Sequence, residues 1–122
     1  MSEQAPVVAV TLTNDVRIVE FTNNKILDEA NIAEIGATLS LLIDDKDVEQ
    51  PKLLLDFTSV DHLSSAALGM LINANNRIKQ RNGQLRLSNI KTQIFEVFRI
   101  TKLDRLFKIF DTRDEAMASF NA

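Results

Sequence analysis

The sequence predicts an α/β fold, with one domain built on a mixed β-sheet of about five strands and about four helices. The length of 122 residues is enough for one hydrophobic core and too short for two comfortable domains. Segments with strand-like and helix-like apolar spacing alternate along the chain. The run KLLLDF at 52–57 leads into a long amphipathic stretch and a further apolar run, which is the order of a βαβ unit with parallel strands.

Two β-branched runs near the N-terminus predict a hairpin. The runs at 7–12 and 16–21 are separated by the polar break 13–15, which is suited to a turn. The second run alternates imperfectly between apolar and polar residues, which allows burial on both faces. Residues 1–6 are expected to form a flexible N-terminal lead.

The first helix is expected to begin after an interruption at 23–25. Asp28 and Asn31 are the candidate N-caps of this helix. The acidic run 44–49, followed by Pro51, places its end at about residues 43–45, because negative charge is unfavourable at a helix C-terminus. Its apolar stripe consists of Ile32, Ile35, Leu39, Leu42 and Ile43.

The run 52–57 is the strongest candidate for a central strand covered on both faces. A polar turn and an amphipathic helix follow it. We expect this helix to end at Asn82-Gly83, with Gly83 as the left-handed residue that stops it. The next strand is expected at 84–87 and parallel to the first, because a helix connects the two.

Three shorter elements are expected in the last third of the chain. The segment 92–98 is too rich in apolar residues for a fully exposed helix, so it predicts a short helix packed on the sheet. A final short strand is expected near 107–110. Thr112 followed by Glu115 is a capping-box pattern that opens a last helix.

The composition excludes several classes of function. The net charge of -3, with scattered basic residues, argues against nucleic acid as a direct partner. A chain without cysteine and with one histidine has no sulfur or histidine metal cluster, and three glycines form no Gly-rich phosphate loop, so we expect no metal and no cofactor. There is no signal peptide pattern, and no apolar run approaches the roughly 20 residues of a membrane span. We expect a cytoplasmic protein that is not embedded in a membrane.

The polar turn between the central strand and the long helix is the candidate functional feature. We call residues 58–65 the serine turn, because they end in Ser64 and Ser65. One interpretation is structural, since serine is among the best helix N-caps. The other is regulatory: a hydroxyl at a helix start is exposed, and a phosphate there would bring about -1.5 to -2 charges beside free helix N–H groups.

Hydrolysis by a serine nucleophile is the less favoured alternative. His62, Asp61 and Asp56 could be drawn as a triad with Ser65, but adjacent residues on one turn rarely converge in that geometry, and the G-x-S-x-G motif is absent. The acidic run 44–49 lacks the spacing of a calcium loop and is interpreted as a solvated charge run.

The segment 60–71, VDHLSSAALGML, resembles the signature turn of STAS domains, the sulfate-transporter and anti-sigma-factor-antagonist family. The resemblance covers nearly the whole chain, including the LLLDF strand, the LRLSNI strand and the stretch FEVFRITKLDRLFKIF. It implies a single STAS-like domain over residues 1–122, with the helices packed mainly on one side of the sheet.

The resemblance also implies a function. Ser65 matches the serine that is phosphorylated in bacterial antagonists, with Ser64 as the alternative acceptor. The unphosphorylated antagonist binds an anti-sigma factor, a serine-protein kinase with a nucleotide site of the histidine-kinase type, and so frees the sigma factor. The chain would then have no catalytic activity of its own. The expected partner-binding residues are Asp61, His62, Ser64, Ser65, Ala66, Ala67 and Gly69.

Two positions depart from the family pattern. Ser64 occupies a place often held by aspartate, and Ala67 stands where glycine is usual. A positive φ at Ala67 would cost roughly 1 kcal/mol and reshape the turn. The alternative function is a STAS scaffold subunit of a signalling assembly, or an accessory subunit of a membrane transporter, without phosphorylation. We expect a monomer or a weak homodimer.

Overall fold

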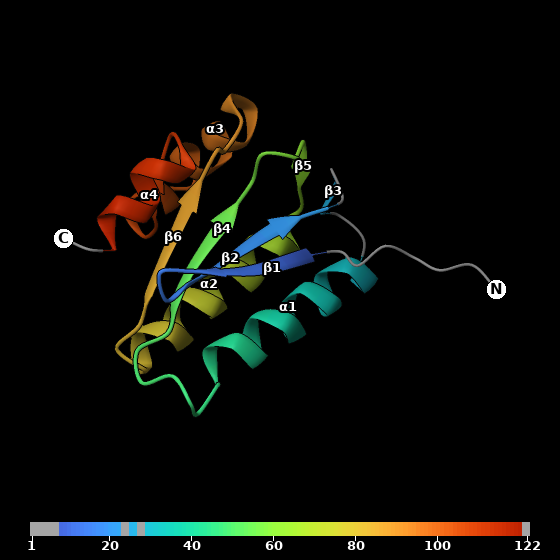
Figure 1. The fold of residues 1–122 in the computed structure, drawn as a ribbon. Coiled ribbons are helices and arrows are strands. Elements are labelled where there is room, and N and C mark those ends of the chain that lie inside the picture. Colours follow the sequence, from blue (N-terminus) through green and yellow to red (C-terminus); the bar gives the residue numbers. More distant parts are fainter. Residues whose placement is uncertain (1–7, 23–24, 27–28, 121–122) are drawn as a thin grey trace.

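The computed structural model describes residues 8–22, 25–26 and 29–120, and a five-stranded mixed sheet forms its centre (Figure 1). The strand order is β1-β2-β4-β6-β7, with β1 antiparallel to β2 and the other neighbours parallel. This confirms the predicted mixed sheet and its parallel βαβ unit. The strands are β1 (Val8–Thr13), β2 (Val16–Phe21), β4 (Lys52–Asp56), β6 (Gln84–Ser88) and β7 (Lys108–Phe110).

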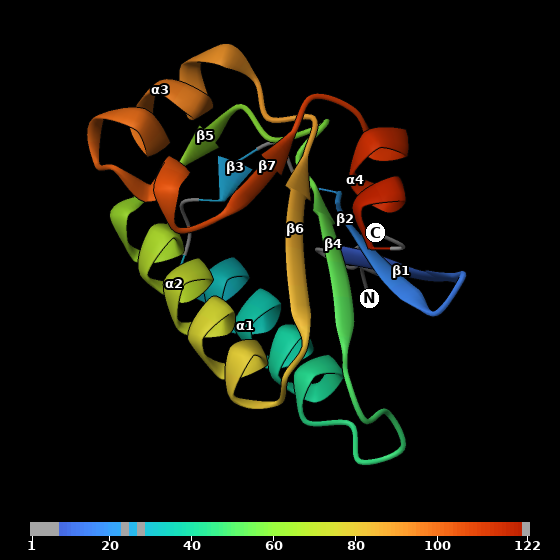
Figure 2. The same cartoon turned by 90° about the vertical axis from the view of Figure 1, so that its left-hand side faces the viewer.

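The helices cover the two faces of the sheet unequally. α1 (Glu29–Ile43), α2 (Ser65–Gln80) and α3 (Thr92–Ile100) contribute buried residues to the main core on one face. α4 (Arg113–Ser119) lies on the opposite face, as Figure 2 shows. The prediction of four helices packed mainly on one side is therefore confirmed. The smaller core under α4 consists of Val16, Ile18, Leu54, Ala116 and Phe120.

The N-terminal hairpin has the predicted strands and a two-residue turn. Asn14 and Asp15 have φ angles of 50° and 67°, and Thr13 pairs with Val16 across the turn. Positive φ at both central residues is the type I′ geometry that fits the twist of a hairpin, and Asn and Asp adopt it most readily after glycine. β2 is buried on both faces, with Ile18 in the smaller core and Val19 in the main core.

The first helix ends at Ile43, as predicted. Asn31 lies inside α1 and is not its N-cap, because the helix has already begun at Glu29. The other candidate cap, Asp28, and the expected lead at 1–6 lie outside the described residues. Ile35, Leu39 and Ile43 are buried against the sheet, which confirms the apolar stripe.

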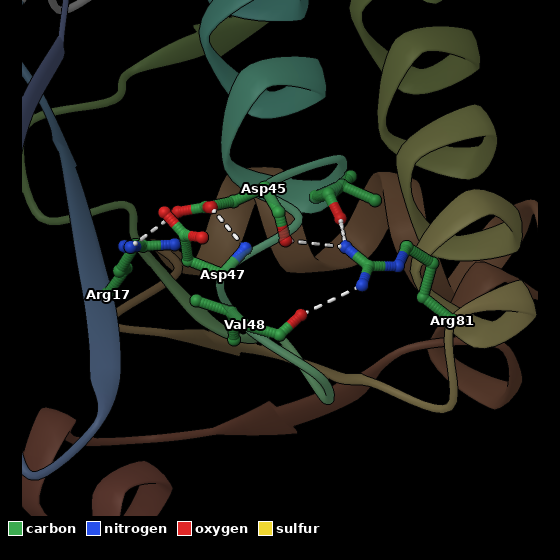
Figure 3. Close-up of polar contacts among 6 residues, drawn as sticks. Arg17, Asp45, Asp47, Val48 and Arg81 are labelled. Carbon is green, nitrogen blue, oxygen red and sulfur yellow. Dashed lines mark hydrogen bonds and ion pairs between the residues drawn. The ribbon is translucent and has the colours of Figure 1, made fainter.

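The loop between α1 and β4 is held by arginines (Figure 3). Arg81, at the end of α2, donates to the carbonyl oxygens of Ile43 at 2.7 Å, Asp45 at 2.9 Å and Val48 at 2.8 Å. Asp45 accepts from Arg17 at 2.9 Å. The pKa of Asp45 is lowered by the hydrogen bond from the Asp47 amide and by Arg17. The acidic run is therefore only partly the solvated stretch that its composition predicts.

The prediction for Gly83 is wrong in its reason. Asn82, with a φ of 58°, is the left-handed residue after α2, and no described glycine has positive φ. Glycine is needed at 83 for space, because a Cβ there would lie 2.7 Å from Ile78 Cγ1 and closer still to the carbonyl oxygen of Pro51. The chain of Pro51 passes this close because its carbonyl accepts from the Gln84 amide at 2.9 Å.

Candidate functional site

The two serines of the serine turn have different structural positions. Ser64 is the N-cap of α2 and is half-buried, and its Oγ accepts a hydrogen bond from the Ala67 amide at 3.1 Å. Ser65 is the first helical residue and is exposed. The amides of the first helical residues have no partner within the helix, and the first turn of α2 contains no acidic residue. The helix start is therefore electropositive.

The backbone of the serine turn is anchored at two points before the exposed Ser65. Val60 is fully buried, and its amide donates to the Phe57 carbonyl at 3.0 Å. The next residues form a short strand, β5 (His62–Leu63), which pairs in parallel with β3 (Lys25–Ile26). This second sheet was not predicted, because a two-residue strand carries no periodicity. It fixes the path of the chain just before α2.

Asp56 holds the first part of the turn from inside. Its carboxylate is buried at the end of β4 and accepts hydrogen bonds from the Thr58 amide at 2.9 Å and the Thr58 hydroxyl at 2.5 Å. Arg113, at the start of α4, donates to its other oxygen at 2.5 and 3.0 Å. Burial raises the pKa of Asp56, but the hydrogen bonds from Thr58 and Arg113 outweigh it, and the net shift is downward.

Asp61 connects the turn to the start of α3. Its carboxylate forms an ion pair with Lys91, the residue that precedes the first turn of α3. Both side chains are partly exposed, so this pair lies at the surface. Asp61, one of the expected partner-binding residues, thus also has a structural contact within the chain.

Small residues form the exposed surface beside the turn. We call Ser65, Ala66 and Gly69 the small-residue surface, since all three are exposed on the first turns of α2. A Cβ added at Gly69 would meet nothing within 4 Å. A glycine inside a helix costs about 1 kcal/mol relative to alanine. The packing of this chain therefore gives no reason for Gly69, whereas a closely approaching partner would.

Ala67 differs from the other expected partner-binding residues. It is helical and fully buried, and it is not among the described residues with positive φ. The cost expected for a left-handed alanine therefore does not arise. Its methyl group supports α2 from the core, so this side chain is not available to a partner. His62 is exposed in β5, three residues before Ser65, and the Ser64 side chain caps α2.

The geometry gives no support to the hydrolase alternative. Both oxygens of Asp56 are already used by Thr58 and Arg113, and Asp61 pairs with Lys91. Among the described residues, no group of three or more acidic or histidine side chains is placed to hold a metal ion. In the same part of the chain, none of the helices has the length and apolar character that crossing a bilayer requires.

Sequence reasoning missed the residues that hold the turn from a distance. Lys91 and Arg113 lie 30 and 57 positions from the aspartates they contact. No local pattern pairs residues so far apart. The usable signal was the aspartate at the end of a buried strand, because a buried carboxylate needs charged or polar partners.

Curated relatives and one family model match parts of the chain. Residues 8–116 match the family described as STAS domain. The Bordetella bronchiseptica protein BtrV, assigned as an anti-sigma factor antagonist, is 27% identical over 95 residues, which are 78% of this chain and 79% of BtrV. A Thermotoga maritima protein of the same assignment is 33% identical over 66 residues, covering 54% of this chain and 58% of its own length.

Solved structures share the fold. A STAS domain protein from Planctomyces limnophilus has a TM-score of 0.83 at 21% identity, covering 94% of this chain and 98% of its own. The phosphorylated form of the Bacillus cell fate determinant SpoIIAA has a TM-score of 0.71 at 18% identity, covering 93% of this chain and 98% of its own. A sulfate transporter family protein from Wolinella succinogenes has a TM-score of 0.69 at 16% identity, covering 89% of this chain and 87% of its own.

Proposed function

The chain belongs to the STAS domain family, and on this premise we propose that it is an anti-sigma factor antagonist switched off by phosphorylation of Ser65. The unphosphorylated chain binds an anti-sigma factor that is also a serine-protein kinase, and this binding releases the sigma factor. The names of the two curated relatives support the antagonist role. The exposed position of Ser65 at the start of α2 carries the proposal of the switch.

The contact surface in this proposal is centred on the small-residue surface. Ser65, Ala66 and Gly69 carry no charge and little bulk, so a partner can approach the backbone of α2 closely. His62 and Asp61 border this surface on the side of the turn. Small, uncharged contacts of this kind leave little room for a new group, which makes the complex sensitive to modification.

A phosphate on Ser65 affects the free chain and the complex differently. In the free chain it adds about -1.5 to -2 charges at a helix N-terminus, where negative charge is favourable. The fold therefore tolerates it. In the complex, the same group is bulky and charged within a neutral contact, so it weakens binding through steric conflict and desolvation. Ser64 is the poorer acceptor because it is half-buried and its oxygen caps α2.

The test is a phosphorylation assay with the cognate kinase and ATP. The native chain, Ser64→Ala and Ser65→Ala are incubated in parallel and analysed by mass spectrometry of peptides that contain the serine turn. We expect one phosphate on the native chain and on Ser64→Ala, and none on Ser65→Ala. Unchanged phosphorylation of Ser65→Ala, or no phosphate on the native chain, contradicts the proposed acceptor.

A second candidate function follows from the likeness to the Wolinella succinogenes transporter family protein. In this alternative the chain is a scaffold or transporter accessory subunit that is not phosphorylated. Affinity purification of the chain from cells at native expression levels distinguishes the two candidate functions. Recovery with a kinase supports the antagonist, whereas recovery with membrane transporter subunits or in a large homo-assembly supports the alternative. A cytoplasmic location is part of the proposed antagonist role.

A further inference from the structure

The edge strand β1 has no neighbour on its outer side among the described residues. The sheet order places it at one end, next to β2 only (Figure 1). Its sequence, VAVTLT, contains no charged residue and no proline. Val10 and Leu12 are 43% and 65% exposed. Edge strands are usually protected by lysine, proline, bulges or a covering segment. The sequence of β1 contains neither lysine nor proline.

The register of the hairpin determines which backbone groups of β1 point outward. A two-residue turn makes its flanking residues, Thr13 and Val16, a hydrogen-bonded pair. Alternate residues of an antiparallel pair then point toward and away from the neighbouring strand. Thr13, Thr11 and Ala9 therefore use their N–H and C=O groups on β2. The outward set is Val8, Val10 and Leu12.

The outward set is self-complementary about a two-fold axis. We propose that two copies of this chain associate edge to edge through β1, antiparallel, with Val10 opposite Val10 and Val8 opposite Leu12. In this register every outward N–H and C=O group of Val8, Val10 and Leu12 has a partner on the second copy. Two five-stranded sheets become one continuous sheet.

The side chains fit the same register. Residues two apart on a strand share one face of the sheet, so Val8, Val10 and Leu12 lie on one face. Val8 belongs to the main core, which identifies that face as the one covered by α1 and α2. The cross-strand pairs are Val–Val and Val–Leu, which are favourable neighbours. Pairing removes the exposed Val10 and Leu12 from water and extends the core across the two-fold axis.

A second copy is the occupant that the charge pattern favours. Two uncharged strands meet without repulsion, and the central residue pairs with itself, as a two-fold interface requires. The opposite edge strand, β7, has three residues and begins with the exposed Lys108, so it offers no comparable surface. Specific stable interfaces bury about 1,200–2,000 Å², and one six-residue strand pair provides less. The dimer is therefore weak and depends on concentration.

Sedimentation velocity of the full chain, from low micromolar to near-millimolar concentration, tests the proposal. The average mass is expected to rise from one chain toward two. Val10→Lys places a charge on the two-fold axis, and Val10→Pro removes an outward N–H while leaving the hydrogen bonds to β2. Both variants are expected to remain monomeric. The control Ile100→Lys changes an equally hydrophobic exposed residue on α3 and should dimerise like the native chain.

Hydrogen exchange of the native chain gives a second readout that needs no variant. The amides of Val10 and Leu12 should exchange severalfold more slowly at high concentration, whereas those of Ala9 and Thr11 are protected at every concentration. A native chain that stays monomeric overturns the proposal, as does a dimer in which the amides of Val10 and Leu12 exchange equally fast at all concentrations. Neither result bears on phosphorylation of Ser65, which lies on α2.

Discussion

The Oγ atom of Ser64 accepts a hydrogen bond from the backbone amide of Ala67 at 3.1 Å, and this contact caps α2. Adjacent serines thereby acquire separate roles. Ser64 satisfies one of the free amides of the helix start, which leaves Ser65 exposed and without this structural task. Stability and regulation at the serine turn can therefore be tested with different substitutions.

Loss of the cap should lower stability without involving the partner. Ser64→Ala is expected to lower the free energy of unfolding by about 1 kcal/mol, because the Ala67 amide loses its acceptor. Ser64→Asp should keep the cap, since aspartate is an equally good N-cap. Urea denaturation measures the free energy of unfolding of both Ser64 variants. The matched control is Ser65→Ala, for which we expect a change within about 0.5 kcal/mol. Equal losses for the two alanine variants would contradict the separate roles.

Gly69 should reveal a conflict between stability and binding. Gly69→Ala is expected to raise the free energy of unfolding by about 0.5–1 kcal/mol, because the added methyl meets no atom of this chain and restricts the unfolded state. The same methyl is expected to weaken partner binding. Gly36→Ala is the control, because its Cβ would make an ordinary 3.7 Å contact with Met70 on a face directed toward α2. A stabilised Gly69→Ala that binds normally would exclude Gly69 from the partner surface.

Gly83 is required for space, and so its replacement should be costly. Gly83→Ala is expected to lower the free energy of unfolding by about 1–3 kcal/mol, since the Cβ would overlap Ile78 and the backbone of Pro51. Asn82→Gly should be nearly neutral, because Asn82 holds the left-handed conformation that glycine also adopts. Thermal or urea unfolding compares the two. If Gly83→Ala were neutral and Asn82→Gly destabilising, the explanation of this helix end would be wrong.

Asp56 should contribute stability that depends on pH. Its pKa in the folded chain is below the ordinary value of 3.8, so the unfolded chain takes up a proton first as the pH falls. The contribution is complete above about pH 5 and is lost as the pH falls through 3.8 toward the lower folded value. Asp56→Asn should therefore cost about 1–3 kcal/mol at pH 7, because Arg113 loses the nearer of its two carboxylate partners and keeps only Glu20 at 3.1 Å.

Urea unfolding of the native chain and Asp56→Asn at pH 7, 5 and 3 checks this expectation. The difference in free energy of unfolding between the native chain and Asp56→Asn should become smaller at the lowest pH. Asp111→Asn removes the same charge from an exposed position and should cost no more than about 0.5 kcal/mol at pH 7. If the free energy of unfolding of Asp56→Asn differed from that of the native chain by the same amount at every pH, the lost stability would not come from the ionised carboxylate.

Local patterns in the sequence predicted most of the fold. The hairpin at Asn14-Asp15, the central strand and the capping box at Thr112 each depend on neighbouring residues, and each is confirmed. The role of Gly83 does not follow from local sequence, because the need for space there comes from Pro51, a residue distant in sequence.

The candidate site was predicted less completely than the fold. Ser64 and Ser65 could be located because a strand, a polar turn and a helix follow one another. The pairs Asp56–Arg113 and Asp61–Lys91, and the β3–β5 pairing, join segments that only the folded chain brings together. The burial of Ala67 follows from its helical spacing with the buried Leu71 once α2 is known to include residue 67, but the sequence does not show which serine is the cap.

The central claim is that the partner binds the serine turn while Ser65 is uncharged and is excluded by a negative charge at Ser65. The direct measurement is the dissociation constant of the anti-sigma factor complex for the native chain, Ser65→Ala, Ser65→Asp and, as a charge-matched control, Ser64→Asp. We predict that Ser65→Ala and Ser64→Asp bind like the native chain, while Ser65→Asp binds at least about tenfold more weakly, a difference of about 1.4 kcal/mol. Binding of Ser65→Asp as tight as that of the native chain would contradict the claim.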